Sequence, residues 1–298
     1  MVYFENPTKQ VIITAVGPDN IGLAEPIVSY ATKSGANICE IQMFNRDSQS
    51  VFAMMIRADW PLEKISISQM RKDLSALGED KNLQTHCWQL IVTDRKPRIA
   101  LCCTKHPQTS VAILEAIRDG SLNAEVSVMI SNREYCRELA GEYNVPYVMI
   151  GDEKGKADNA KFLSVLDEHQ VDYVVLARYM QILPEEVCWS YAGGRIINLH
   201  HGLLPPYPGA TPYSDAYAHN MLTYGATAHF IIPELDAGNQ IIHQTSFSVE
   251  PSTPLKEVIH QGKHANEPKC LVGAIQKVVN GAVALHFNKV VQISNRNP

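Results

Sequence analysis

The sequence lacks the features that mark several large classes of protein. Its 298 residues contain no run near the ~20 apolar residues that a membrane-spanning helix needs. The N-terminus, MVYFENPTKQ, has neither the basic nor the apolar segment of a secretion signal. Lysine and arginine number 26 against 31 acidic residues, which gives a formal charge of −5 and no basic surplus for a polyanion. These absences predict a cytoplasmic protein that acts on neither nucleic acid nor membrane.

Motifs for metals, disulfides and nucleotides are also missing. The 7 cysteines are scattered without a CxxC pair, so neither a disulfide framework nor a zinc ribbon is predicted. The HExxH and GxSxG motifs are absent. Thr104–Gln108 contains no glycine, although it follows an apolar strand-like run where a dinucleotide-binding fold has its phosphate loop. We therefore expect no bound metal and no tightly bound cofactor.

What is present begins with a compact N-terminal pattern. Strand-like runs and amphipathic helical runs alternate in the order βαββαβ, with strands expected at 10–16, 38–44, 51–56 and 83–92 and helices at 21–34 and 62–77. This order is that of the ferredoxin-like fold, in which both helices cover one face of an antiparallel sheet. A polar connection at 93–97 predicts a boundary between two domains, 1–93 and 94–298.

The second part has the rhythm of an α/β domain. Strands are expected at 98–103, 124–130, 147–150, 171–177, 196–198, 223–232 and 240–249, and helices at 111–118, 133–143, 157–169 and 254–279. A long loop rich in proline and glycine, 199–212, follows the strand expected at 196–198. The pattern predicts a Rossmann-like, doubly wound parallel sheet, whose ligands bind beyond the carboxyl ends of the strands.

Candidate chemistry is concentrated at the end of the strand that closes at Asn198. Asn198 and His200 bracket one residue, so alternation points both side chains the same way. An imidazole can act as a general acid or base, and an amide N–H can donate to an oxyanion. The alternative is purely structural, with Asn198 capping a turn and His200 packed in the core.

A second stretch, GATAHFIIPELDAGNQII at 225–242, adds His229 and Asp236. Strand packing alone could explain His229, and a turn alone could explain Asp236. If both stretches meet in one cleft, a carboxylate, an imidazole and an amide converge and can activate water or an amine. A zinc site is the minor alternative, because no compact ligand spacing recurs.

These residues resemble a known family. N-L-H-H-x-L-L-P-P-Y-P-G-A-x-P-Y at 198–213, with G-A-T-A-H-F and E-L-D-A-G inside 225–238, is similar to the folate-dependent formyltransferases. G-P-D-N-I-G-L at 17–23 followed by G-A-N-I at 35–38 resembles an ACT domain. The combination, which covers nearly the whole chain, resembles the arrangement of the formyltetrahydrofolate deformylase family.

The resemblance implies both a reaction and residue roles. The reaction is hydrolysis of 10-formyltetrahydrofolate to formate and tetrahydrofolate, within one-carbon metabolism and purine biosynthesis. Asn198 and protonated His200 would hold the developing oxyanion, Asp236 would orient His200 and the water, and His229 would support them. The pterin would be gripped at L-A-R-Y-M-Q-I-L, 176–183, and near Asp236, by Arg178, Met180, Gln181, Ile182, Leu183, Pro233, Glu234 and Leu235.

The ACT resemblance implies a regulatory site. An amino acid would bind at Asp19, Asn20, Ile21 and Gly22, although the same residues could serve only as a turn. ACT domains commonly pair edge to edge, which covers exposed strands, so the resemblance also implies a homo-oligomer, either a dimer or a tetramer.

The sequence departs from the deformylase pattern in three places. Gly202 stands where these enzymes have serine, and Gln108-Thr109-Ser110 stands where they have His-Cys-Leu. Two residues, Asn239 and Gln240, separate the Asp-Ala-Gly turn from the Ile-Ile pair instead of one. Two alternatives therefore stay open: formyl transfer to a small amine without a phosphate, and a non-catalytic folate or amino-acid sensor.

Overall fold

A computed structural model describes residues 8–46, 50–61, 66–92, 94–232 and 240–293, with the side chains of 44–46 excepted. The chain divides into two compact units, one formed by 1–93 with 184–193 and the other by 94–183 with 194–298. Among the described residues no helix has the length and apolar character needed to cross a bilayer.

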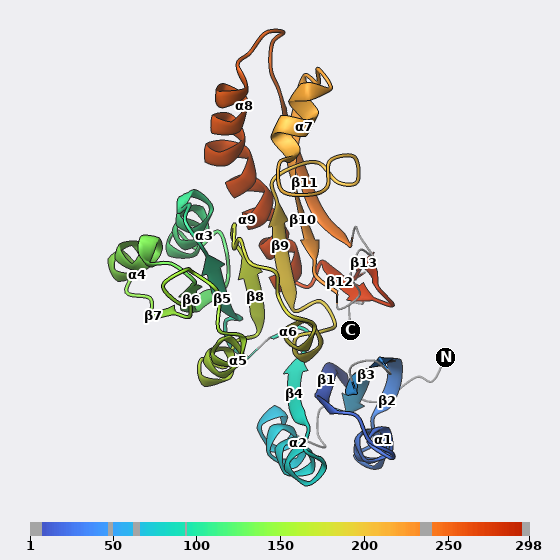
Figure 1. Ribbon diagram of the computed structural model, residues 1–298. Coiled ribbons are helices and arrows are strands. Elements are labelled where there is room, and N and C mark those ends of the chain that lie inside the picture. The colour runs from blue at the N-terminus through green and yellow to red at the C-terminus, as the bar shows by residue number, and fades with distance from the viewer. Residues whose placement is uncertain (1–7, 47–49, 62–65, 93, 233–239, 294–298) are drawn as a thin grey trace. The chain divides into compact units, whose positions relative to one another are not determined.

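The first unit is built on a four-stranded antiparallel sheet with the strand order β2-β3-β1-β4 (Figure 1). Its elements are β1 (Thr8–Pro18), α1 (Ala24–Lys33), β2 (Asn37–Arg46), β3 (Val51–Pro61), α2 (Ile67–Lys81) and β4 (Gln84–Gln89). One apolar core joins the two helices to the sheet, with Ile13, Ile27, Ile56 and Leu74 almost fully buried. The predicted ferredoxin-like order is confirmed.

Helix α2 differs from its expected span. We expected a helix over 62–77 closed by Gly78, but α2 continues through Gly78 to Lys81 and ends at Asn82, which takes the left-handed conformation with φ of 56°. Gly78 is buried, and a Cβ there would meet the backbone of Leu83. This glycine therefore serves close packing, and the asparagine ends the helix. Residues 62–65 lie outside the described part.

Helix α6 (Glu185–Ser190) belongs to the first unit although it follows β8 in the chain. The buried Thr14 hydroxyl of β1 donates to the carbonyl of Ser190 at 2.9 Å. This helix was not predicted, because its six residues are too few to show a helical period.

The second unit contains a seven-stranded sheet with the order β11-β10-β9-β8-β5-β6-β7. Its strands are β5 (Arg98–Cys103), β6 (Glu125–Ser131), β7 (Tyr147–Met149), β8 (Tyr173–Leu176), β9 (Ile196–His200), β10 (Thr223–Phe230) and β11 (Ile241–Ser248). The Rossmann-like fold is confirmed, with β5 to β9 parallel as expected. Strand β10 pairs antiparallel with both β9 and β11, so the whole sheet is mixed.

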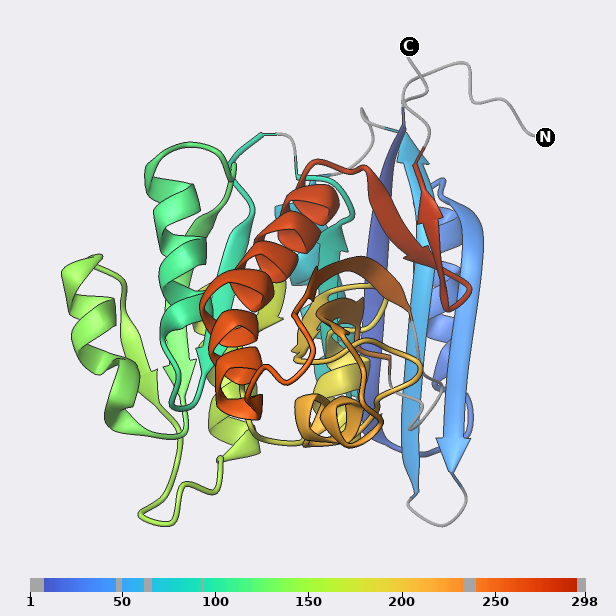
Figure 2. The same cartoon turned by 90° about the horizontal axis from the view of Figure 1, so that it is seen from above.

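Helices and a short hairpin complete this unit. They are α3 (Gln108–Arg118), a 3₁₀ turn η1 (Glu134–Cys136), α4 (Arg137–Glu142), α5 (Asn159–Glu168), α7 (Pro212–Ala218), α8 (Leu255–Gln261), a π turn η2 (Gly262–Asn266), α9 (Glu267–Val279), β12 (Val283–His286) and β13 (Lys289–Gln292). Figure 2 shows α9 beside α3, and side chains of both belong to the main apolar core. The single helix expected at 254–279 is thus interrupted by a π turn, and α7, β12 and β13 were not predicted.

Candidate active site

The paired strands β9 and β10 bring Asn198 and His229 together. Their backbone register places the two residues directly opposite each other. Asn198 Nδ2 donates to His229 Nε2 at 3.1 Å, and His229 Nδ1 donates to the carbonyl of Phe230 at 3.1 Å. Both bonds are satisfied by a neutral His229 with its proton on Nδ1, and burial lowers the pKa of that imidazole. The bond to His229 therefore fixes which way the Asn198 amide faces.

A bulge helps to aim the histidine of this pair. The pairing of β10 with β11 shifts between Ala228 and His229. Such bulges bend a strand locally and re-aim side chains, and they are common beside active sites. No property of the sequence around 228–229 indicated the bulge.

His200 lies two residues beyond Asn198 on the same face of β9. Its Nε2 donates to the carbonyl of Tyr207 at 2.7 Å, which leaves Nδ1 as the acceptor of the neutral ring. Burial lowers the pKa of His200, which favours this neutral form. Burial thus opposes the protonated His200 that the resemblance implied. Asp236, the carboxylate implied beside it, lies outside the described residues.

The loop that follows His200 is held by one buried hydroxyl. Thr227 Oγ1 of β10 donates to the carbonyl of Gly202 at 2.8 Å and accepts from the amide of Leu204 at 3.0 Å. Gln244 Nε2 of β11 donates to the same hydroxyl at 3.0 Å. The loop backbone is therefore fastened to two strands directly after the predicted catalytic residues. Thr227 was not predicted, because its contacts are with residues 23 and 25 positions away in the chain.

Gly202 is where the chain departs from the deformylase pattern, and it is tightly enclosed. A Cβ at this position would overlap the ring of Pro212 and stand 3.0 Å from His200 Nε2. Its glycine therefore lets Pro212 and the His200 imidazole approach the backbone. A serine here would need the loop to move.

The side chain of Arg178, a residue predicted to bind folate, is engaged by another side chain of the protein. Its Nη1 donates to both carboxylate oxygens of Glu267 at 2.9 and 2.7 Å, and Glu267 is fully buried. The Tyr213 hydroxyl donates to the same carboxylate at 3.2 Å. Arg178 adopts a φ of 58°. The contribution of Arg178 to a ligand would accordingly come from its backbone. Glu267 was not predicted, although a carboxylate at the start of an apolar helix was a signal that could have found it.

The rest of the expected pterin segment is more open. Met180 is 51% exposed and Ile182 is 91% exposed, which is high for apolar side chains. The amide of Met180 donates to Thr104 Oγ1 at 3.0 Å, so this backbone is anchored to the turn after β5. Gln181 donates to the carbonyl of Met180 at 2.7 Å, and Leu183 closes the segment. The segment therefore combines an anchored backbone with uncovered apolar side chains.

The remaining predicted residues either fall outside the described part of the chain or belong to the first unit. Pro233, Glu234, Leu235 and Asp236 fall outside the described residues, as does Asn239. Asp19, Asn20, Ile21 and Gly22 form an exposed loop of the first unit between β1 and α1, in which Asn20 Oδ1 accepts from the amide of Ile21 at 2.8 Å. Ile21 is 98% exposed, not part of a buried helical face as its spacing suggested. Within the described part of the chain, no group of three or more His, Cys, Asp or Glu side chains is placed to hold a metal ion.

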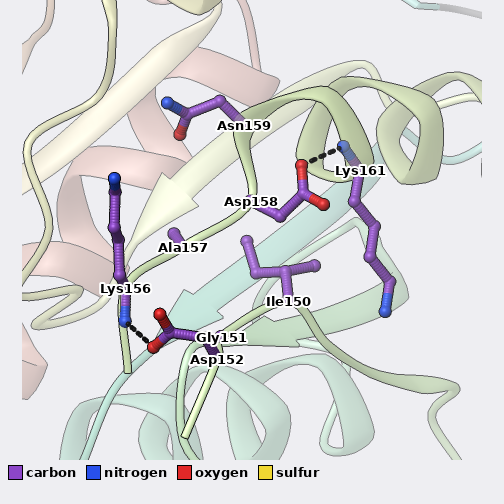
Figure 3. A pocket seen from close by; sticks show the side chains of 8 residues that line it. All are labelled: Ile150, Gly151, Asp152, Lys156, Ala157, Asp158, Asn159 and Lys161. Carbon is purple, nitrogen blue, oxygen red and sulfur yellow. Dashed lines mark hydrogen bonds between the residues drawn. The ribbon is translucent and has the colours of Figure 1, made fainter. Parts of the chain in front are cut away.

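A hollow of about 540 Å³ lies elsewhere in the second unit, between the end of β7 and the start of α5 (Figure 3). Its two carboxylates are already engaged: Asp152 accepts from the amide of Lys156, and Asp158 accepts from the amide of Lys161. Strands β8, β5 and β6 separate β7 from β9 in the sheet. This hollow is therefore separate from the Asn198 and His200 site.

Two domain families match the sequence, a formyl transferase over residues 97–275 and an ACT domain over 9–88. A formyltetrahydrofolate deformylase from Haemophilus influenzae is 31% identical over 95% of this chain and 98% of its own length. One from Bacillus subtilis is 30% identical over 92% and 90%. The chain belongs to the formyltetrahydrofolate deformylase family.

Solved structures agree with this membership. A deformylase crystal structure from Pseudomonas syringae has a TM-score of 0.63 at 25% identity, covering 98% of this chain and 96% of that one. A phosphoribosylglycinamide formyltransferase from Anaplasma phagocytophilum has a TM-score of 0.60 at 27% identity and covers 68% of this chain. The similarity to the deformylase structure therefore extends over almost the whole chain, whereas the similarity to the formyltransferase structure covers only about two thirds of it.

Proposed function

We propose that this protein hydrolyses 10-formyltetrahydrofolate to formate and tetrahydrofolate. The observation that carries the proposal is the Asn198 amide fixed by His229 on the same strand face as His200, in a chain of the deformylase family. An oriented amide donor beside an imidazole is suited to a reaction in which water attacks a formyl carbon.

The chemistry divides among three side chains. The water oxygen bonds to the formyl carbon, and the formyl oxygen becomes an oxyanion that accepts a hydrogen bond from the Asn198 amide. His200, neutral with Nδ1 unprotonated, is suited to receive the water proton, either alone or with Asp236. As the oxyanion re-forms a carbonyl, the bond from carbon to N10 breaks, N10 takes the proton that was removed from the water, and formic acid leaves and ionises to formate. His229 acts as a positioning residue, since it contacts the Asn198 amide.

The folate would be bound largely through backbone groups. We place the pterin against 178–183 and 233–236, because Met180 presents an anchored backbone and Ile182 an uncovered side chain. No tightly bound cofactor is proposed. Formyl transfer to a small amine lacking a phosphate is the second candidate, since the same three groups could activate an amine.

Isotope labelling separates these reactions. The purified full-length protein is supplied with 10-formyltetrahydrofolate in ¹⁸O-labelled water and without any amine. Hydrolysis predicts equal amounts of tetrahydrofolate and formate, with one ¹⁸O in each formate. Asp236→Asn, which keeps the size of the side chain and removes its charge, is expected to abolish most of this turnover. Product formed only after an amine is added would overturn the hydrolase, and binding without turnover would favour a sensor.

The N-terminal half is proposed to be regulatory. We assign residues 1–93 to an ACT domain that binds an amino acid at Asp19, Asn20, Ile21 and Gly22, residues 94–298 to the catalytic domain, and the active form to a homo-oligomer. An effector must bind two states of the protein with different affinity to act. Calorimetric titration of the full-length chain with glycine and methionine tests the site, and an absence of heat with both would count against it. The cytoplasmic location stays a prediction.

A further inference from the structure

A cluster of cationic groups surrounds the turn between β5 and α3. Lys263 of the π turn places Nζ 3.4 Å from His106 Nε2. Because an ammonium can only donate, His106 accepts with Nε2 and is the neutral imidazole. Lys105 precedes His106 in the same turn, and its ammonium lies 5.5 Å from the centre of the Tyr135 ring. Arg178 follows β8, the strand paired with β5.

The charge of this cluster is not balanced by its own carboxylate. Glu267 is fully buried, and both of its oxygens accept from Arg178. One carboxylate therefore offsets one guanidinium. Lys105 and Lys263 remain as two positive charges, and no ion pair of either with a carboxylate occurs among the described residues.

The first turn of α3 adds unused donors. Pro107, the residue that precedes the helix, supplies no side-chain hydrogen bond to the first amides. Thr109 and Ser110 in that turn are 1% and 0% exposed, and their hydroxyls find no hydrogen-bond partner in the described part of the chain. Buried hydroxyls are normally paired, so this turn holds two donors for which the described residues supply no acceptor. The open amides of a helix N-terminus favour an anion.

The titration behaviour of two imidazoles agrees with a positive local field. The pKa of His106 is lowered to about 4, first by desolvation and then by Lys263, Arg178 and Lys105. The pKa of His201 is also lowered to about 4, first by desolvation and then by Arg178. His106 also lowers the pKa of His201, so both of these rings lie within electrostatic reach of the cluster.

We propose that this cluster binds a small carboxylate, held by Lys263, Lys105 and the first turn of α3. The assignment rests on the proposed function, whose product, formate, is such a carboxylate. A nucleotide phosphate is disfavoured because Thr104–Gln108 has no glycine to let backbone amides wrap around it. The planar guanidinium of Arg178, the other usual phosphate ligand, is already occupied by Glu267.

The experiment measures binding without turnover. Histidine ring signals of the full-length protein are followed by NMR during titration with sodium formate, without folate and against sodium chloride at equal ionic strength. His106→Gln and His201→Gln assign the two signals. An anion of three heavy atoms is expected to bind with a Kd of about 1 mM. The expected result is saturable shifts of both rings with formate and none with chloride.

Charge-removing variants then test the residues. Lys263→Met is expected to weaken formate binding by about 10-fold or more, because a charge-assisted hydrogen bond is lost. Lys256→Met, an exposed lysine of α8, is the matched control and should leave the Kd unchanged. Lys105→Met is an exposed second variant that tests the site should Lys263→Met fold poorly.

Each outcome decides the proposal. The proposal is supported if the saturable formate-induced shifts are lost in Lys263→Met or Lys105→Met and are kept in Lys256→Met. No saturation at concentrations well above about 1 mM, or equal shifts with chloride, would overturn it. Tighter binding of inorganic phosphate than of formate would overturn the choice of a carboxylate. Formate binding to a protein that releases none from 10-formyltetrahydrofolate would contradict the proposed function and leave the anion site standing.

Discussion

Asn198 and His229 face each other across β9 and β10, with Asn198 Nδ2 donating to His229 Nε2 at 3.1 Å. The histidine completes its hydrogen bonding through the carbonyl of Phe230, so its acceptor nitrogen always faces the amide. The orientation of the Asn198 amide is thus set before any substrate binds. Preorganised donors of this kind stabilise an oxyanion without rearranging during the reaction.

Asn198→Asp tests the donor directly. A carboxylate of the same shape cannot donate to an oxyanion, so kcat is expected to fall by about 10²–10³-fold. Steady-state kinetics with 10-formyltetrahydrofolate measure the change. Asn220→Asp is the matched control, because Asn220 is exposed at the end of α7. A loss below about threefold in Asn198→Asp would remove Asn198 from the catalytic set.

Substitutions of His229 can separate its hydrogen bond to Asn198 from the packing of its ring. His229→Phe removes the acceptor for Asn198 and should lower kcat by about 2–10-fold, the worth of one hydrogen bond, with little change in KM. His229→Gln offers an oxygen acceptor and should recover part of the loss. The two substitutions Asn198→Asp and His229→Phe should not be additive in kcat. Full additivity would mean that His229 acts independently of Asn198.

Gly202 is expected to tolerate no side chain. Gly202→Ala places a methyl group against Pro212 and beside His200 Nε2, and overpacking of this kind costs about 1–3 kcal/mol of unfolding free energy. Thermal unfolding and kcat should both fall. Gly141→Ala is the control, because Gly141 is exposed in α4 and a Cβ there meets nothing within 4 Å. Equal stability of the two variants would show that the loop adapts.

Acid should destabilise the fold through His201. The pKa of His201 is lowered to about 4 in the folded protein, against about 6.5 in an unfolded chain. The unfolded state therefore binds more protons between these values, and stability falls as the pH drops from about 6.5 to about 4. Denaturant unfolding across this range should be less pH-dependent in His201→Gln than in the wild type. An unchanged slope would contradict the neutral state of the half-buried His201.

Much of the fold was predictable because its elements carry local signals. The run RIALCC is apolar at nearly every position, as a strand covered on both faces requires, and β5 spans those six residues. The helix α2 was misjudged because glycine usually ends helices, whereas Gly78 makes a close contact and Asn82 ends it. The π turn at 262–266 was missed because the apolar pattern continues across it.

The site residues that were predicted from the sequence are those that lie close together along the chain. Asn198 and His200 share a strand face through simple alternation, and the structure adds His229 through cross-strand register. Thr227 and Glu267 act through partners far along the chain, which periodicity cannot reveal. The neutral state of His200 follows from burial, a property of the folded protein alone.

The assignment of the active site is tested by comparing His200→Ala with His201→Ala in formate release from 10-formyltetrahydrofolate without an amine. His200 is the last residue of β9 and shares a strand face with Asn198, whereas His201 follows the strand and its Nε2 donates to the carbonyl of Ala210 at 3.2 Å. His200→Ala is expected to lower kcat by about 10²–10⁴-fold, whereas His201→Ala is expected to retain most of the activity. A larger loss in His201→Ala than in His200→Ala would contradict the assignment of the active site.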